Sequence, residues 1–181
     1  MRNDKNAIDF LNKKGRFELK YIIDGDSCNL ILARLSHFMT LDSNVNNKGY
    51  YINRSLYYDT PGFKEYHEYI NGEKRRRKFR LRKYDIESNL GNFEIKQKVN
   101  KIIWKDKIKV DQKKAANFFT TPWSYSEDSE FGQFAHLLAR KRYEPKCTVV
   151  YQRIALSDIL NTGVRISFDY NLKTGMVDMF D

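Results

Sequence analysis

Basic and apolar side chains alternate through residues 76–84, and this alternation limits the fold more than any other feature of the sequence. The even positions are basic and the central odd positions are apolar: Arg76, Lys78, Arg80 and Arg82 alternate with Phe79 and Leu81. Successive side chains of a β-strand point to opposite faces of its sheet. The run therefore predicts a strand that is basic on one face and apolar at the centre of the other.

The same division into a charged and an apolar face recurs in other segments. Arg16, Glu18 and Lys20 oppose Phe17, Leu19 and Tyr21; Glu94, Lys96 and Lys98 oppose Phe93, Ile95 and Val99; Lys105, Lys107 and Lys109 oppose Trp104, Ile108 and Val110; Arg165, Ser167 and Asp169 oppose Val164, Ile166 and Phe168. Because each apolar face must be covered, we expect helices to pack on it from outside. The charged faces then point toward one another.

The remaining pattern completes one α+β domain over residues 1–181. Strands are expected at 16–22, 50–58, 74–84, 93–96, 103–110, 146–155 and 164–170, and helices at 27–40, 112–119 and 129–142. Asp26 or Ser27 is the expected N-cap of the first helix, and Asn71-Gly72 predicts a hairpin. Residues 63–70 fit a helix or an extended segment, and residues 156–161 fit a short helix or a turn. No linker or internal repeat divides the chain, so we expect a single antiparallel sheet.

This sheet has two possible forms. A flat antiparallel sheet would leave its charged face in water, which is common. A β-barrel would turn the charged faces inward, and about eight strands enclose one small ligand. We favour the barrel, in which repulsion between cations is offset by water, by a bound anion, or by carboxylates such as Glu18, Glu94 and Asp169. Arginine grips phosphate oxygens in a bidentate manner, so the lumen would suit polyanionic phosphates.

Net charge identifies the class of partner. The chain has 33 Lys and Arg against 23 Asp and Glu, a formal charge of +10, which suits nucleic acid, an anionic membrane or polyphosphate. A lumen excludes a duplex, and most aromatic residues alternate onto the face opposite the cations, which is poor geometry for stacking single-stranded nucleic acid. We therefore expect no nucleic acid partner, although a basic surface interleaved with Tyr keeps that reading open. With no membrane span and no signal-peptide core, a cytoplasmic location is the expectation.

Taken together, several motifs resemble the VTC domain, the polyphosphate polymerase domain of the vacuolar transporter chaperone family, within the CYTH-like triphosphate tunnel metalloenzymes. They run in family order: Phe17-Glu18-Leu19-Lys20-Tyr21, Ser55-Leu56-Tyr57-Tyr58-Asp59-Thr60-Pro61, the alternating run 76–84, Phe93-Glu94-Ile95-Lys96, Lys105-Asp106-Lys107, Tyr151-x-Arg153 and Arg165-Ile166-Ser167-Phe168-Asp169. The resemblance implies a tunnel that binds ATP, triphosphate and polyphosphate, with sulfate or phosphate as simpler occupants.

The resemblance also implies roles for individual residues. The phosphate-binding positions would be Lys20, Lys78, Arg80, Arg82, Lys96, Lys105, Arg153 and Arg165, and the catalytic ones among them Arg80, Arg82, Lys96, Arg153 and Arg165. Their role would be to neutralise charge while the γ-phosphoryl group of ATP moves to a polyphosphate chain. Glu18 and Glu94 would hold Mn²⁺ or Mg²⁺.

The sequence departs from the family pattern after Asp169. The pattern continues there with strands that carry a metal-binding Glu and further Lys residues, whereas this sequence ends at Asp181. We therefore expect a barrel that is incompletely closed at its C-terminal side and a protein for which binding is better supported than polymerisation. The alternatives are a tunnel-type triphosphatase and a non-catalytic polyphosphate or anion-binding module.

Overall fold

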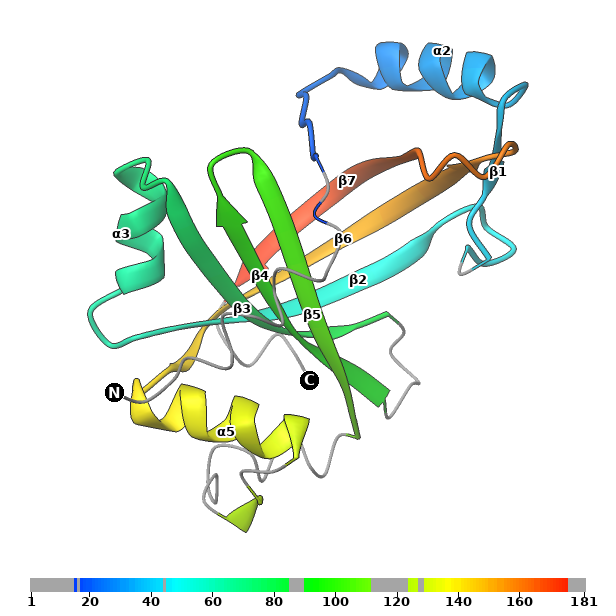
Figure 1. Cartoon of the computed structure of the whole chain (residues 1–181). Coiled ribbons are helices and arrows are strands. Elements are labelled where there is room, and N and C mark those ends of the chain that lie inside the picture. The colour runs from blue at the N-terminus through cyan, green and yellow to red at the C-terminus, as the bar shows by residue number, and fades with distance from the viewer. Residues whose placement is uncertain are drawn as a thin grey trace.

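The structure is a computed structural model, and it describes residues 15, 17–43, 45–84, 90–111, 124–126 and 129–175. Its elements are α2 (Gly25–Leu35), β1 (Met39–Leu41), β2 (Tyr51–Asp59), α3 (Lys64–Ile70), β3 (Arg75–Lys83), β4 (Leu90–Val99), β5 (Ile102–Asp111), α5 (Glu130–Arg140), β6 (Glu144–Asp158) and β7 (Arg165–Gly175). Figure 1 shows their arrangement.

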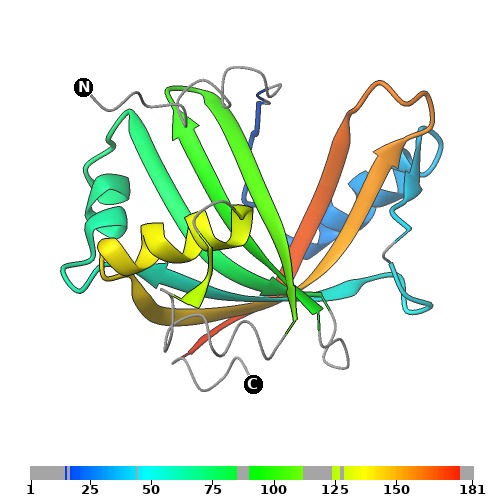
Figure 2. The same cartoon turned by 60° about the horizontal axis from the view of Figure 1, so that its bottom comes forward.

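The strands form one seven-stranded sheet in which every pairing is antiparallel. The order is β1-β6-β2-β3-β4-β5, and β7 pairs with β6. The long strand β6 therefore carries β1 and β2 on one edge and β7 on the other. Figure 2 shows the sheet curled into a trough, with β3–β5 as one wall and β6–β7 as the other. This half-barrel confirms the predicted α+β class, and the strands that the structure describes do not close into a full barrel. Within the described residues, the opening lies between β5 and β7.

The main hydrophobic core lies on the outer, convex face of the sheet. Helix α5 packs Phe134, Ala135 and Leu138 against Phe79 of β3 and Phe93 of β4. Phe79 and Phe93 are each only 1% exposed, so the apolar face predicted from the alternation is the buried one. The prediction that helices cover the sheet from outside is confirmed.

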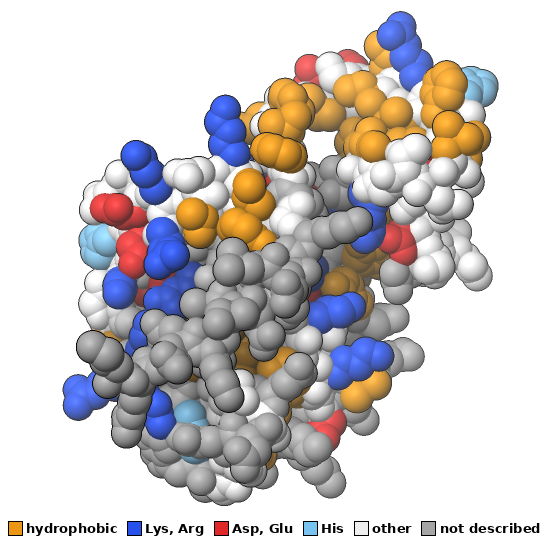
Figure 3. Space-filling view, viewed as in Figure 1, with side chains coloured by type: hydrophobic (Ala, Val, Ile, Leu, Met, Phe, Trp, Pro, Cys, Tyr) orange, Lys and Arg blue, Asp and Glu red, His pale blue; other side chains and the backbone are white. Residues whose placement is uncertain are grey.

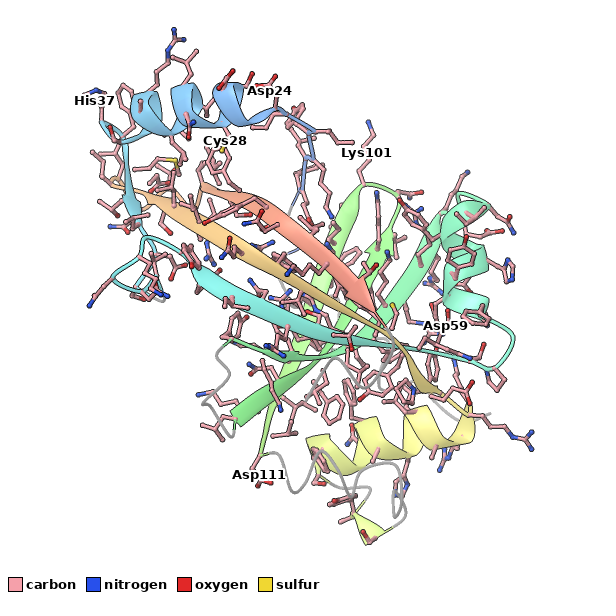
Figure 4. All side chains as sticks on the ribbon, turned by 180° about the vertical axis from the view of Figure 1, so that it is seen from behind. Asp24, Cys28, His37, Asp59, Lys101 and Asp111 are labelled. Carbon is pink, nitrogen blue, oxygen red and sulfur yellow. The ribbon has the colours of Figure 1, made fainter. Side chains whose placement is uncertain are left out.

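A second, smaller core lies beneath α2. Met39, Leu156 and Phe168 are buried there, and Cys28 and Leu32 of α2 pack on them. Figure 4 shows Cys28 pointing from the helix toward the strands below it. The alternation of β6 puts Leu156 on the same face as Thr148, which pairs with the core residue Leu56. Both helices therefore cover one face of the sheet, and the other face is left to line the trough.

Four local expectations need correction. Asn71-Gly72 does not form a hairpin but joins helix α3 to strand β3. Residues 17–24 are extended but belong to no strand, because no sheet edge hydrogen-bonds to them among the described residues. The helix expected to reach residue 40 ends at Leu35, since residues 39–41 pair with β6 and bury Met39. Its N-cap is Asp24, whose carboxylate accepts a 2.7 Å hydrogen bond from the Ser27 N–H, and not Asp26 or Ser27.

The structure also decides between the two possibilities left for residues 63–70 and for residues 156–161. Residues 64–70 are helical, and Asp59 begins this helix by accepting the N–H groups of Glu65 and Tyr66 (3.0 and 2.9 Å). Figure 4 shows Asp59 at this junction. Residues 156–158 belong to β6, and a turn follows them. The expected helix at 112–119 lies outside the described residues.

Candidate functional site

The inner face of the trough is built by the even residues of β3 and the residues that pair with them. Directly opposed residues of antiparallel strands lie on the same face. The register places Lys78 opposite Lys96 and Lys96 opposite Lys105. Three lysines thus stand side by side across β3, β4 and β5, and we call them the lysine row.

Each lysine of this row has a different neighbour. The Lys78 ammonium lies 4.4 Å from the centre of the Tyr69 ring, in a cation–π contact. Lys96 contacts the Glu18 carboxylate. Lys105 reaches diagonally to Glu94. Like charges directly opposite each other destabilise a sheet, so these contacts offset part of the repulsion within the row.

Glu94 is the buried centre of the neighbouring part of the face. Its side chain is 1% exposed, and Arg80 approaches it at 2.6 Å through Nη2 and 2.7 Å through Nε. The Arg82 Nε lies 3.7 Å away, and Lys105 contacts the other carboxylate oxygen. One buried carboxylate therefore faces three cations. Burial lowers the Arg82 pKa, but the negative charge of nearby Glu94 acts in the opposite direction, and the pKa is raised overall.

Tyrosines lie among these cations on the same face. The Arg80 Nη1 donates to the Tyr57 hydroxyl at 3.1 Å, and the Arg82 Nη1 donates to that of Tyr84 at 3.2 Å. Tyr151 lies near the Arg82 and Arg153 cations, and burial raises the Tyr151 pKa. The alternation through 76–84 already places Tyr84 on the basic face, but the expectation that most aromatic residues lie on the opposite face is wrong for Tyr57 and Tyr151. The period-two pattern of β2, in which Leu56 faces the core, could have placed Tyr57 inside.

Arg153 and Arg165 extend the basic face along β6 and β7. Arg153 forms a bidentate pair with Asp169, with both N–O distances 2.6 Å. Burial lowers the Arg153 pKa, but the hydrogen bonds to Asp169 act in the opposite direction, and the pKa is raised overall. Arg165 lies farther along the same face, where it contacts Asp42. It is therefore separated from the lysine row, although the alternation places it on the same side of the sheet.

Beneath Arg82, two polar side chains of β2 are buried on the inner face. Asn53 and Ser55 are both 0% exposed, and neither the Asn53 amide nor the Ser55 hydroxyl has a hydrogen-bond partner among the described residues. Ser55 stands directly opposite Arg82. Buried polar groups of this kind are usually satisfied by ordered water. The sequence motif gave no reason to single out Asn53.

The predicted site residues that lie on strands thus share one face of the sheet, but they do not converge on one point. Lys78, Arg80, Arg82, Lys96 and Lys105 form a contiguous group on β3–β5. Lys20 is different: its side chain is 80% exposed, and its ammonium lies 3.8 Å from Glu18. Glu18 comes from the extended segment before α2.

The predicted metal ligands face cations in this structure. Glu94 meets Arg80, Arg82 and Lys105, and Glu18 meets Lys96. Within the described ranges, no group of three His, Cys, Asp or Glu side chains comes together as a metal site. In this arrangement the residues do not fit a divalent ion, and the assignment of Mn²⁺ or Mg²⁺ to Glu18 and Glu94 stays a prediction.

Comparisons with known proteins find a matching family model and 12 solved chains of similar structure, two of which are described here. The model of the family described as "VTC domain" matches residues 15–179, whereas no curated protein matches the sequence. A "putative adenylate cyclase" from Bacillus halodurans is 12% identical with a TM-score of 0.49, over 87% of this chain and 79% of that one. The PH1819 protein from Pyrococcus horikoshii OT3 is 13% identical with a TM-score of 0.37, over 77% of each chain. None of the helices described here has the length and apolar character needed to cross a membrane.

Proposed function

The chain belongs to the VTC domain family, and from this premise we propose that its inner face binds the phosphate chain of ATP or of linear polyphosphate. The proposal concerns the group on β3–β5, where Arg80, Arg82 and the lysine row lie on one side of the sheet. Arg153 continues the basic surface toward β7. Lys and Arg side chains are visible on the face of the molecule that Figure 3 presents, which is the view of Figure 1.

The lysine row is the observation that carries this proposal. Lys78, Lys96 and Lys105 are direct neighbours across three strands, which are spaced about 4.8 Å apart. Such a row is unfavourable for the empty protein, because like charges opposite one another destabilise a sheet. A bound polyanion would turn this repulsion into attraction, so the cost to the empty protein is consistent with a role in binding.

The arginines add directional contacts to the lysine row. Arg80 is offset from Lys78 by two residues along β3, a distance of about 6.6 Å, so a chain of phosphoryl groups could contact both. Guanidinium groups grip phosphate oxygens in bidentate fashion. The Tyr57 and Glu94 contacts hold Arg80 in place before a ligand arrives, which reduces the ordering cost of binding.

We further propose that the γ-phosphoryl group of ATP is transferred to polyphosphate at this site. Catalysis of phosphoryl transfer consists mainly of positioning and of electrostatic stabilisation. Here Arg80, Arg82, Lys96 and Arg153 would neutralise the charge that shifts to the leaving diphosphate. Arg165, beside Asp42, would contact only a longer chain.

Calorimetry with tripolyphosphate, at low and at physiological salt, tests the binding. We expect heat of binding at low salt and weaker affinity at higher salt, since exposed charges are screened. No detectable binding at low salt would overturn the proposal. Analysis of products after incubation with ATP then distinguishes the activities: longer polyphosphate supports transfer, orthophosphate alone supports a triphosphatase, and intact ATP supports a binding module.

A further inference from the structure

We infer that Glu18 is an internal competitor for the phosphate site, occupying Lys96 until a polyanion displaces it. This inference rests on the proposed function, because it concerns the same lysine row. It assigns to the segment 17–23 the role of a strap that lies across the trough and is attached there through one carboxylate.

The contacts of Glu18 place it at the centre of the row. Its Oε2 contacts the Lys96 ammonium, and its Oε1 lies 3.8 Å from that of Lys20. Lys96 is the middle lysine, flanked by Lys78 and Lys105 in register. The Glu18 carboxylate thus stands where a phosphoryl group would meet the highest density of positive charge.

The rest of the segment makes little contact with the protein. The Glu18 side chain is 28% exposed, whereas Phe17, Leu19, Tyr21 and Ile22 are 76%, 77%, 79% and 104% exposed. Large apolar side chains gain nothing from this position, because burial is what stabilises them. The ion pair between Glu18 and Lys96 therefore accounts for the position of the segment.

A second point of attachment lies at residue 15. A Cβ added to Gly15 would collide with Ile102 and lie 3.3 Å from the Trp104 ring, so the backbone there rests on side chains of β5. From this point the segment passes between the walls formed by β5 and β7 toward α2, as Figures 1 and 2 both show. Only this part of the chain crosses the opening among the residues described.

Competition for Lys96 has two consequences. An anion that engages the lysine row must first separate Glu18 from Lys96, so the apparent affinity is lower than the cations alone would give. Once Glu18 is displaced, the segment loses its ionic attachment to the sheet. Binding is therefore coupled to release of residues 17–23, and a ligand acts only through its stronger interaction with the released state.

The test compares tripolyphosphate binding by the wild type and by Glu18→Gln in buffer with EDTA. The exchange keeps the shape of the side chain but removes its charge. We expect about two- to fivefold tighter binding, the scale of a partly exposed ion pair. Asp26→Asn, which removes one negative charge from the exposed start of α2, controls for net charge and should change the affinity less than twofold.

A second measurement follows the segment in the protein that retains Glu18. A nitroxide label at Leu19→Cys, with Cys28 and Cys147 replaced by Ser, should become more mobile when tripolyphosphate is added. Equal or weaker binding by Glu18→Gln, or a label whose mobility does not change on binding, would overturn the inference. If neither wild type nor variant binds tripolyphosphate, the proposed function itself has failed.

Discussion

Replacing Glu94 with Gln should show how much its ion pairs contribute to the stability of the protein, and how much of that stability a bound polyanion can restore. Glu94 is the buried carboxylate that faces Arg80, Arg82 and Lys105. Glutamine keeps the volume of the side chain but leaves these cations without their counter-ion. Removal of one partner from a buried ion pair costs about 3–5 kcal/mol, a large fraction of the usual 5–15 kcal/mol of stability.

The expected result follows from this magnitude. For a chain of this size, a loss of 3–5 kcal/mol lowers the melting temperature by about 6–20 °C. Tripolyphosphate should recover much of this loss, because it supplies the missing negative charge. A ligand present at 100 times its dissociation constant stabilises the folded state by about 2.7 kcal/mol. We expect a larger ligand-induced rise in melting temperature for Glu94→Gln than for the wild type.

The control is the same exchange at an exposed carboxylate. Glu144 contacts Lys146 and its side chain is 50% exposed, so Glu144→Gln should change stability by less than about 1 kcal/mol. Differential scanning fluorimetry with and without tripolyphosphate measures all three proteins. The reasoning is refuted if Glu94→Gln has the same melting temperature as the wild type, or if tripolyphosphate raises the melting temperature of the variant less than that of the wild type.

Three further changes test neighbouring parts of the site and the fold. Arg82→Ala should weaken tripolyphosphate binding by about 1.5–3 kcal/mol, the scale of a charge-assisted hydrogen bond, and calorimetry showing unchanged affinity would remove Arg82 from the site. Tyr57→Phe removes only the hydroxyl that accepts from Arg80, so it should weaken the same binding by no more than about 1.5 kcal/mol. Burial raises the Glu65 pKa despite the opposing hydrogen bond from Tyr143. Protonation of Glu65 therefore favours the folded state below the ordinary carboxyl range, and this contribution is lost as pH rises through the raised pKa. Glu65→Gln should then melt higher than the wild type at pH 8 but not at pH 4, and a higher melting temperature at both pH values would contradict this assignment.

The sheet could be predicted where the sequence separates two kinds of face. The alternation through 76–84 gave both the strand and its buried side, because Phe79 and Leu81 can reach the core only from that side. The same pattern in residues 17–22 did not give a strand. Alternation identifies a segment that is able to join a sheet. The segment becomes a strand only if a neighbouring strand has an edge free for hydrogen bonding, and this depends on the whole fold.

The composition of the site could be predicted better than its contacts. The alternation of side chains along each strand is enough to place the Lys and Arg residues of β3–β5 on one face. The meeting of Glu94 with Arg80 and Lys105 depends on strand register, which the sequence did not give. Tyrosine was also misleading because it has an apolar ring and a polar hydroxyl. Tyr58 packs in the core, while its neighbour Tyr57 binds Arg80 on the opposite face.

The position of β5 gives its lysines a further consequence. Among the described residues, β5 pairs only with β4 and thus forms an open edge of the sheet. Charged side chains on such an edge, lysine above all, keep sheets of neighbouring molecules from joining. Lys105, Lys107 and Lys109 would therefore protect the protein from self-association while they attract an anion. A polyanion that neutralises them also removes this protection, so the concentration at which the protein stays dispersed should depend on how fully the trough is occupied.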